Sequence, residues 1–518
     1  MTTPRPTHTV DVILTARDPH LLARPDPEVP FRILIMGDFS GRETKQGRAD
    51  QRAPATRRPI RVDRDNIRNM LGTLDVTLHS PLLGDNAPPI TLKFAEIEDF
   101  HPDRLVHQVE PLRTLSDLRR RLANSTTFPE AADEIHKWAQ SREQVAARPV
   151  TTESPHHQTN AGDSPTNSLL DHILDQAPTS ARDLRPTEWQ SFLQSIVSPY
   201  AIPKEHPRVQ EFTAQVDAAM SQIMRTVLHH PTFQAFERTW RGLSFVVDRL
   251  ETDTQLQLYL LDLPKSELAA DLLNHDDLQG TELYKLVVQE TVRTPGAQPW
   301  AVVGGVYTFD RTTEDAAMLE RIASLCKKAG APFLAGASPA TSFGTTPDPD
   351  DWKISATQES EQNHWDRFRH LPEAAYMGLA LPRFLLRLPY GKGTEPISAF
   401  TFEEMVGVPN HEHFCWGNPL FACLVLLGQA FSESGWEMRP GSIKDIEGLP
   451  IHVYQNGSGE TVTKPCAEVL FTEETVEALL ERGLMPLISF KNQDQIRLAR
   501  FQSLTSPPTA LMGRWNTV

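Results

Sequence analysis

Proline is the feature that most limits what this chain can fold into. The 518 residues include 42 prolines, about 8% against a usual share of about 5%. Proline lacks the amide hydrogen that helix interiors and central strands need, so it interrupts both. The proline content therefore disfavours long coiled coils and helical solenoids, and it predicts short elements joined by many ordered turns.

The charge balance and the hydrophobic content exclude several classes of protein. Lys and Arg number 51 and Asp and Glu 67, which gives a formal net charge of −16. Sequence-independent binding of nucleic acid or of anionic membranes needs an excess of cations, so neither is expected. A hydrophobic share of 39% is enough for sizeable cores, which places the chain among globular proteins.

Several features predict a cytoplasmic protein. The first ten residues lack the apolar core of a signal peptide. The longest apolar stretch, residues 420–427, is far shorter than the roughly 20 residues that a membrane span needs. No two cysteines have the C-x-x-C spacing, which favours free thiols in a reducing compartment. The cysteines are Cys326, Cys415, Cys423 and Cys466.

Residues 1–140 are predicted to form one unit of mixed strands and helices. Apolar residues alternate along an expected strand at 31–36, which ends at the turn signal of residues 37–41. Pro102 stands where the first residue of a helix is expected, and a further helix is expected at 112–122.

Residues 141–187 read as a flexible linker that carries one short helix. Between Pro149 and Pro165 the composition is too polar to form a core. Residues 168–177 place their apolar side chains on one helical face, but a helix of this length is marginal in water. The face is expected either to dock in a groove of a partner or to pack back on its own domain. Its residues are Leu169, Leu170, Ile173 and Leu174.

Residues 188–518 are predicted to form a larger, layered domain. Helical periodicity alternates there with short apolar runs that are typical of buried strands. The fold class is therefore predicted as mixed α/β, with a small unit joined by the linker to a larger layered α/β domain. The main expected helices are 209–228, 233–250, 266–273 and 316–328, and the expected strands are 256–261, 299–306 and 332–335.

The search for catalytic motifs finds no established pattern. Phosphate-binding loops, dinucleotide fingerprints, zinc-protease motifs and nucleophile elbows are all missing from the sequence. His411, His413 and Cys415 would share one face of a strand, although zinc would need a further ligand. The other interpretation is a loop that leads into a buried Cys-Trp edge. No catalytic residue, cofactor or metal is therefore predicted, and a metal-dependent enzyme built on these three residues stays as an alternative.

A basic loop stands out in the acidic chain. Residues 42–65 contain eight Lys or Arg against four Asp or Glu, a local charge of +4. Such a loop could complement an acidic neighbour, including another copy of the chain, and a solvated loop explains it equally well. The candidate contact residues are Arg42, Arg48, Arg52, Arg57 and Arg58.

Several long strings of residues resemble one family. Residues 30–42 (PFRILIMGDFSGR), 61–66 (RVDRDN) and 99–103 (DFHPD) are similar to the small (TssB- or VipA-like) sheath subunit of type VI secretion systems. The strings that resemble the large (TssC- or VipB-like) subunit are residues 230–243 (HPTFQAFERTWRGL), 378–391 (GLALPRFLLRLPYG), 402–404 (FEE) and 416–419 (WGNP). The resemblance covers about residues 9–140 and 188–505, and it implies a natural fusion of the two subunits.

The function that this resemblance implies is mechanical. In the family, small and large subunits form a tight protomer, and protomers stack in six-membered helical rings around an inner tube. Contraction of this sheath propels the tube, and the free energy is stored in the extended assembly without a cofactor. The implied partners are further copies of the chain, the inner tube protein, a baseplate and an AAA+ unfoldase of the ClpV type.

The resemblance also gives the linker helix a role. A short helix near the start of the large subunit is bound in the family by the unfoldase that recycles contracted sheaths, and residues 168–177 resemble it. The docking role therefore falls on Leu169, Leu170, Ile173 and Leu174.

Two departures from the family pattern bear on the function. Gly304-Gly305-Val306 stand where the family usually has a Gly-Asp-Tyr string. The resemblance also leads us to expect that the usual C-terminal region of the large subunit, which would follow about residue 505, is lacking. The chain is therefore expected to be a shortened contractile-sheath subunit. The alternative is a non-polymerising, sheath-like accessory protein involved in assembly, capping or the baseplate.

Overall fold

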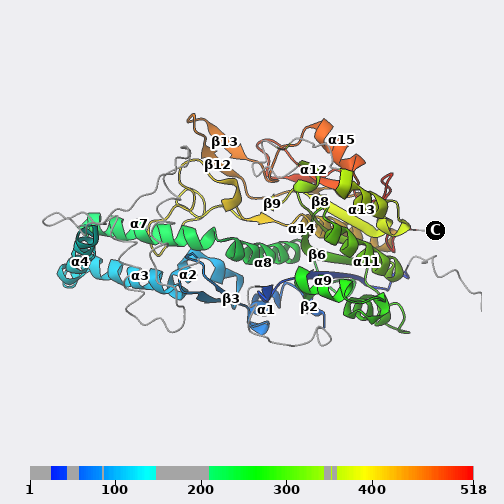
Figure 1. The fold of residues 1–518 in the computed structure, drawn as a ribbon, viewed down its shortest axis with the longest axis horizontal. Helices are drawn as coiled ribbons and strands as arrows, with labels where there is room; N and C mark the ends of the chain where they lie inside the picture. Colours follow the sequence, from blue (N-terminus) through cyan, green and yellow to red (C-terminus); the bar gives the residue numbers. More distant parts are fainter. Residues whose placement is uncertain are drawn as a thin grey trace, which may run out of the picture.

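The computed structural model describes residues 25–43, 58–84, 87–146, 209–343, 352 and 359–516. Within these ranges the chain folds around one large mixed sheet with helices on both faces (Figure 1). Of the expected linker, residues 141–187, the first six residues continue helix α4 (Phe128–Ala146). Residues 147–187, with the expected docking helix 168–177, lie outside the described residues.

Nine strands of the described ranges form the main sheet. Six neighbouring strands, from β14 to β5, run parallel, and antiparallel strands close both ends. In spatial order they are β11 (Asp445–Ile446), β15 (Ile496–Leu498), β14 (Leu484–Ser489), β8 (Met377–Leu381), β7 (Phe333–Ala337), β6 (Val302–Phe309), β1 (Phe31–Gly37), β5 (Leu256–Asp262) and β2 (Ile60–Val62). Three separate antiparallel pairs are β3 (Thr77–Ser80) with β4 (Ile90–Lys93), β9 (Phe384–Leu385) with β10 (Trp416–Gly417), and β12 (His452–Gln455) with β13 (Thr461–Lys464).

Strand β1 is buried on both faces of this sheet. Successive side chains of a strand point to opposite faces. Ile33 and Ile35 accordingly join the core that contains α8 and α14, whereas Leu34 and Met36 join the core that contains α9 and α11. A continuous apolar strand is what a parallel sheet covered on both faces requires.

Helices cover the two faces unequally. The first face carries α8 (Pro231–Arg249) and α14 (Leu420–Ser434), and α14 is buried almost all round, as an apolar helix must be. The second face carries α9 (Lys265–Leu273), α10 (Glu282–Tyr284), the π-helical turn η6 (Lys285–Gln289), α11 (Thr313–Ala329), α12 (Ala340–Phe343), α13 (Glu359–Arg369) and α15 (Glu473–Glu481).

The remaining helices extend the molecule away from the sheet. In Figure 1, α3, α4 and α7 lie at the end opposite the C-terminus. These helices are α1 (Ile67–Thr73), α2 (Pro102–Gln108), α3 (Glu110–Ala123), α4 (Phe128–Ala146) and α7 (Val209–Leu228). Single-turn 3₁₀ helices are η3 (Ile97–Phe100), η5 (Leu278–Gly280), η8 (Pro372–Tyr376), η9 (His411–His413) and η10 (Gly435–Glu437). None of the helices in the described part of the chain combines the length and the apolar character needed to cross a bilayer.

The mixed α/β fold class is confirmed, and so are the main helices and strands expected from periodicity. Pro102 and Pro231 begin α2 and α8, where the missing amide hydrogen costs nothing, and the preceding histidines His101 and His230 cap the helices. Of the two interpretations of residues 411–415, the strand that would share one face is wrong. Residues 411–413 form a 3₁₀ turn, because the Asn410 side chain accepts a hydrogen bond from the amide of Glu412.

Candidate functional site

Helix α8 and four loops converge on a buried cluster of arginine and glutamate side chains. Helix α8 contributes Glu237, Arg238 and Arg241 from neighbouring turns. The loops contribute the other charged members, which are Arg383, Arg387, Glu404, Glu412 and Glu468. All of these except Glu412 and Glu468 belong to the strings that carried the sheath resemblance, so those strings are brought together by the fold.

Arg387 is the centre of the first part of this cluster. Its guanidinium donates to Glu237 at 2.8 and 3.2 Å and to Glu404 at 2.8 and 3.2 Å. The side chains of Arg387, Glu237 and Glu404 are 6%, 1% and 0% exposed. A planar guanidinium with five donors can hold two carboxylates at once, which a lysine could not do with the same geometry.

Arg241 balances the charge of this group. It donates to Glu237 at 2.7 Å, one turn earlier on α8, and to the Tyr390 hydroxyl at 2.9 Å. Glu404 also accepts from the amide of Tyr390 at 2.8 Å. Two cations, one buried and one partly exposed, therefore face two buried carboxylates, and each carboxylate oxygen accepts at least one hydrogen bond.

The network keeps its carboxylates ionised. Burial on its own would raise the pKa of Glu404, but Arg387 and His229 outweigh it and lower that pKa to about 2. The pKa of Glu237 is also lowered, because Arg387 and Arg241 outweigh its burial. Neither carboxylate is available as a proton donor near neutral pH, so the group is suited to holding loops in place and not to acid–base catalysis.

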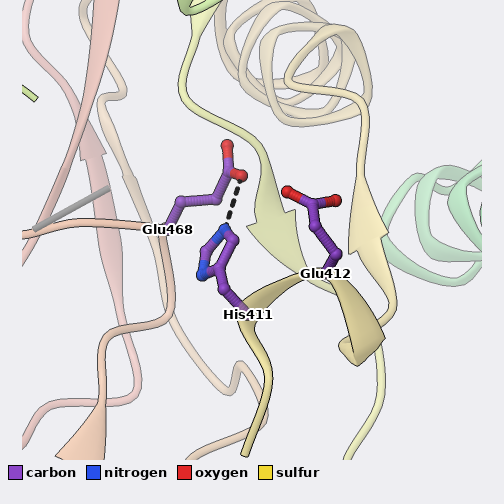
Figure 2. Close-up of side chains that lie close together, drawn as sticks. All are labelled: His411, Glu412 and Glu468. Atoms are coloured by element: carbon purple, nitrogen blue, oxygen red, sulfur yellow. Dashed lines mark hydrogen bonds and ion pairs between the residues drawn. The ribbon is translucent and has the colours of Figure 1, made fainter. Parts of the chain in front are cut away.

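The second part of the cluster is centred on Arg383. Arg383 donates to Glu468 at 2.7 Å and to Glu412 at 3.0 Å, and its main-chain amide also donates to Glu468. The His411 Nε2 atom lies 3.0 Å from the Glu468 carboxylate (Figure 2). Arg238, on α8, ties this part to the 3₁₀ turn through the main-chain oxygens of Glu412 and Phe414.

His411, Glu412 and Glu468 are the group of described residues whose ligand atoms lie close enough to hold a metal ion, within 4.8 Å of one another (Figure 2). Their carboxylates already bind the Arg383 guanidinium, which supplies the positive charge that a metal would supply. Burial alone would raise the pKa of Glu468, but Arg383 and His411 lower it to about 2. The donor set is therefore that of a structural ion-pair network.

The three residues on which the metal-enzyme alternative depends do not converge. His411 faces Glu468, whereas the His413 ring stacks on His229 with ring centroids 3.7 Å apart. Cys415 is buried, and burial raises the pKa of its thiol to about 12, so it stays protonated and is a poor metal ligand. The alternative of a buried Cys-Trp edge agrees with the burial of both Cys415 and Trp416.

His229 is a member of the site that sequence reasoning missed. It lies 3.5 Å from Glu404 and stacks on His413. The next residue, His230, caps α8. Buried carboxylates prefer cationic or hydrogen-bonding neighbours, and this preference is the one signal that could have indicated His229. It can be applied only when the position of Glu404 in the fold is known.

The basic loop is only partly described. Arg42 pairs within the chain with Glu267 at 3.2 Å and lies 4.0 Å from Asp262, so its charge is compensated locally. Arg58 is exposed. Arg48, Arg52 and Arg57 lie outside the described residues.

The first 146 residues are joined to the rest of the chain by polar contacts as well as by the sheet. Asp262, at the end of β5, accepts hydrogen bonds from the amides of Phe39 and Ser40 directly after β1. The Trp240 indole donates to the main-chain oxygen of Phe39 at 2.9 Å. Arg119 of α3 pairs with Asp217 of α7 at 2.6 Å.

Comparison with known proteins gives matches for both parts of the chain. Residues 210–505 match the VipB family, described as the EvpB tail sheath N-terminal domain. Residues 22–145 match the VipA family of the type VI secretion system. The type VI secretion system sheath protein TssC1 of Pseudomonas aeruginosa is 30% identical over 309 residues, which is 58% of this chain. The matched region spans 62% of that relative's length.

Proposed function

The chain belongs to the VipB tail-sheath family of type VI secretion and carries a VipA-family region in front of it, and from this premise we propose that it is a fused sheath protomer. It polymerises with further copies of itself around an inner tube, on a baseplate, in the bacterial cytoplasm. Contraction of the polymer propels the tube. The work is mechanical and uses no cofactor.

The position of strand β1 carries this proposal. β1 belongs to the VipA-like region, yet it lies between β5 and β6 of the VipB-like region and pairs in parallel with both. Two regions that share one sheet are a single rigid body. A building block that transmits force through a polymer needs such a body, because slack between its halves would dissipate the motion.

The arginine–glutamate network supports the same function. Leaving one member of a buried ion pair without its partner costs several kcal/mol, so each displacement of a loop from α8 is penalised. We take the network to hold α8 and its four loops in one geometry, as a sheath subunit requires. Both carboxylates of the Arg387 group have lowered pKa values and stay ionised near neutral pH, which agrees with a structural role.

Electron microscopy of the purified chain tests polymerisation. The expected result is tubes or stacks of rings, with the sheath symmetry imposed by contacts between copies. Only monodisperse particles across a range of salt and concentration would contradict the proposal, and would favour a sheath-like accessory protein instead.

We also propose that residues 168–177 dock on an AAA+ unfoldase of the ClpV type. The helical spacing of their apolar side chains supports this, since an apolar helix face suits a groove on a partner. A peptide of residues 164–180 is expected to bind the unfoldase, and the same peptide with Ile173→Asp is expected to lose binding. Equal binding of both peptides, or no binding by either, would count against the role of Leu169, Leu170, Ile173 and Leu174.

We propose that the basic loop makes contacts between protomers, through Arg48, Arg52, Arg57 and Arg58. Exposed charges separated from their partners are screened by salt, so assembly should weaken between low and high ionic strength. Arg42 is left out of this surface, because it pairs with Glu267 in its own chain. Replacement of the four arginines by glutamine should reduce the salt dependence, and an unchanged dependence would remove the loop from the interface.

A further inference from the structure

The two most exposed large apolar side chains of the described residues lie on one turn. Val406 is 68% exposed and Val408 is 60% exposed. Gly407, between them, has a φ of 71°, a left-handed conformation that suits glycine and turns the chain back at this point. Single exposed valines are common, but two on one turn form a small apolar projection. Residues 405–409 are called the valine tip below.

The valine tip is held in place at both ends. Directly before it, the buried Glu404 carboxylate accepts a hydrogen bond from Arg387 at 2.8 Å. Met405 packs against the small buried cluster that contains Trp416. Directly after the tip, the Asn410 side chain caps the 3₁₀ turn η9. A projection that is fixed in this way loses little conformational freedom when a partner covers it.

A hollow that can receive such a projection lies at helix α13. Its volume is about 460 Å³, and it is lined by His364, Asp366, Arg367 and His370. Asp366 interacts with the neighbouring cation of Arg369. Arg367 is exposed and forms no ion pair with any described residue. The hollow therefore offers a guanidinium charge whose partner is not in the described part of the same chain.

The charge next to the valine tip has the opposite sign. Glu403 is exposed, its carboxylate accepts a hydrogen bond from the amide of Lys392 at 3.0 Å, and it forms no ion pair with any described residue. A carboxylate at the base of the tip thus complements the guanidinium of Arg367 in the hollow.

The two surfaces lie apart in one molecule. The main-chain oxygen of Glu403 accepts a hydrogen bond from Arg225 at 3.0 Å, so the segment that leads into the valine tip adjoins α7. In Figure 1, α7 lies toward one end of the long axis and α13 toward the end that carries the C-terminus. Tip and hollow are therefore placed to meet between copies of the chain.

We propose that the valine tip of one copy inserts into the α13 hollow of the next copy. This contact rests on the proposed polymerisation and assigns a specific surface to it. Burial of the two valines supplies attraction, and the pair of Glu403 with Arg367 fixes the orientation. Two different patches meet, so the contact is heterologous and repeats from copy to copy, as a ring or a helical filament requires.

Cross-linking between two single-cysteine variants of the full-length chain tests the contact. The four native cysteines are buried, so Val408→Cys and His370→Cys each add one exposed thiol. A short bis-maleimide is expected to link the two variants when they are mixed, and to link neither variant to itself. The matched control is Val292→Cys, which replaces another exposed valine and should not link to His370→Cys.

An exchange of charges tests the orientation of the contact. Arg367→Glu in the chain that carries His370→Cys should lower the yield of cross-linked dimer about tenfold, because two carboxylates would then face each other. Glu403→Arg in the chain that carries Val408→Cys should restore the yield. Circular dichroism verifies that each variant folds. A yield that Arg367→Glu does not lower, or that the exchange does not restore, would contradict the proposal.

The mixed cross-link decides the contact itself. Its absence would overturn the proposal, and so would linkage of Val408→Cys to itself, which requires a two-fold contact. Electron microscopy of the unmodified chain separates this result from the proposed function. Tubes without the cross-link would retain the sheath and remove this contact, whereas the cross-link without tubes would retain the contact and count against the sheath.

Discussion

Arg387 shows how one residue can determine the arrangement of a whole region. Its guanidinium connects Glu237 on α8 with Glu404, which lies in a loop 17 residues further along the chain. The guanidinium carbon also lies 4.3 Å from the centroid of the Tyr390 ring. All three charged groups are almost fully buried. A buried ion network of this kind adds little stability compared with apolar residues that replace all of its members. Removal of one member alone lowers the stability strongly, because it leaves the remaining charges buried without a partner.

Replacement of Arg387 by methionine is therefore expected to destabilise the protein strongly. Two carboxylates would lose their shared cation inside the core, at a cost of about 3–5 kcal/mol in the free energy of unfolding. Urea denaturation followed by circular dichroism measures the change. The matched control is Arg497→Met, which breaks a bidentate but exposed pair with Asp445 and should cost far less. Equal losses in the two variants would show that the buried network is not a special contributor.

The same carboxylates predict how stability depends on pH. Glu404 and Glu468 have pKa values of about 2 in the folded protein, below the ordinary value of 4.5 that they regain on unfolding. The unfolded state thus binds more protons between these values, so stability is fully present above about pH 4.5 and falls as the pH decreases toward 2. Urea midpoints measured from pH 6 to pH 2.5 test this. Glu404→Gln should flatten the slope, whereas Glu433→Gln, at an exposed position, should leave it unchanged.

At the scale of elements, helices α8 and α14 pack closely against each other on the first face of the sheet. Gly242 in α8 faces the Phe421 ring of α14, and Phe421 is fully buried. A Cβ atom at position 242 would fall well inside van der Waals contact with that ring. Interiors packed at crystal-like density cannot absorb such an overlap without moving a helix.

Gly242→Ala is accordingly expected to destabilise the protein by about 1–3 kcal/mol, although alanine favours helices more than glycine does. Thermal and urea unfolding measure the loss. Gly393→Ala is the control, because nothing lies within 4 Å of the new Cβ atom there, and it should be neutral or slightly stabilising. The double variant Gly242→Ala/Phe421→Leu should recover part of the loss, and no recovery would contradict the assigned contact.

At the scale of the whole molecule, the two family regions form one body and not two tethered ones. Strand β1 has partners on both sides, and its side chains enter the cores of both sheet faces. The segment between the regions is therefore not needed to hold them together once the sheet has formed. Fusion instead raises the effective concentration of each half for the other during folding.

A protease site introduced at residue 158 should accordingly allow the chain to be cut without separating its halves. The two fragments are expected to elute together in size-exclusion chromatography at the volume of the uncut chain. Ile33→Asp, which buries a charge in β1, should release the fragments after cleavage. Asn69→Asp, at an exposed position of the same region, should not. Separation of the unmodified fragments would show that the shared sheet is too weak to join them.

Local order was readable from the sequence because it depends on neighbours in the chain. Apolar alternation marked β1, Pro102 marked the start of α2, and contiguous strings of residues carried the sheath family resemblance. These signals also set the mixed α/β fold class. At residues 411–413 the Asn410 cap, which is itself a local signal, decides for a turn and against the strand alternative.

The tertiary structure alone decided which distant groups meet. Glu237 and Arg387 lie 150 residues apart, and Ser40 and Asp262 lie 222 apart. A buried charge must have a partner, because an unpaired charge inside the protein costs too much free energy. The sequence does not show which distant residue that partner is. For that reason the sequence by itself determined the elements and the family, whereas the insertion of β1 into the sheet and the Arg387 network came only from the folded chain.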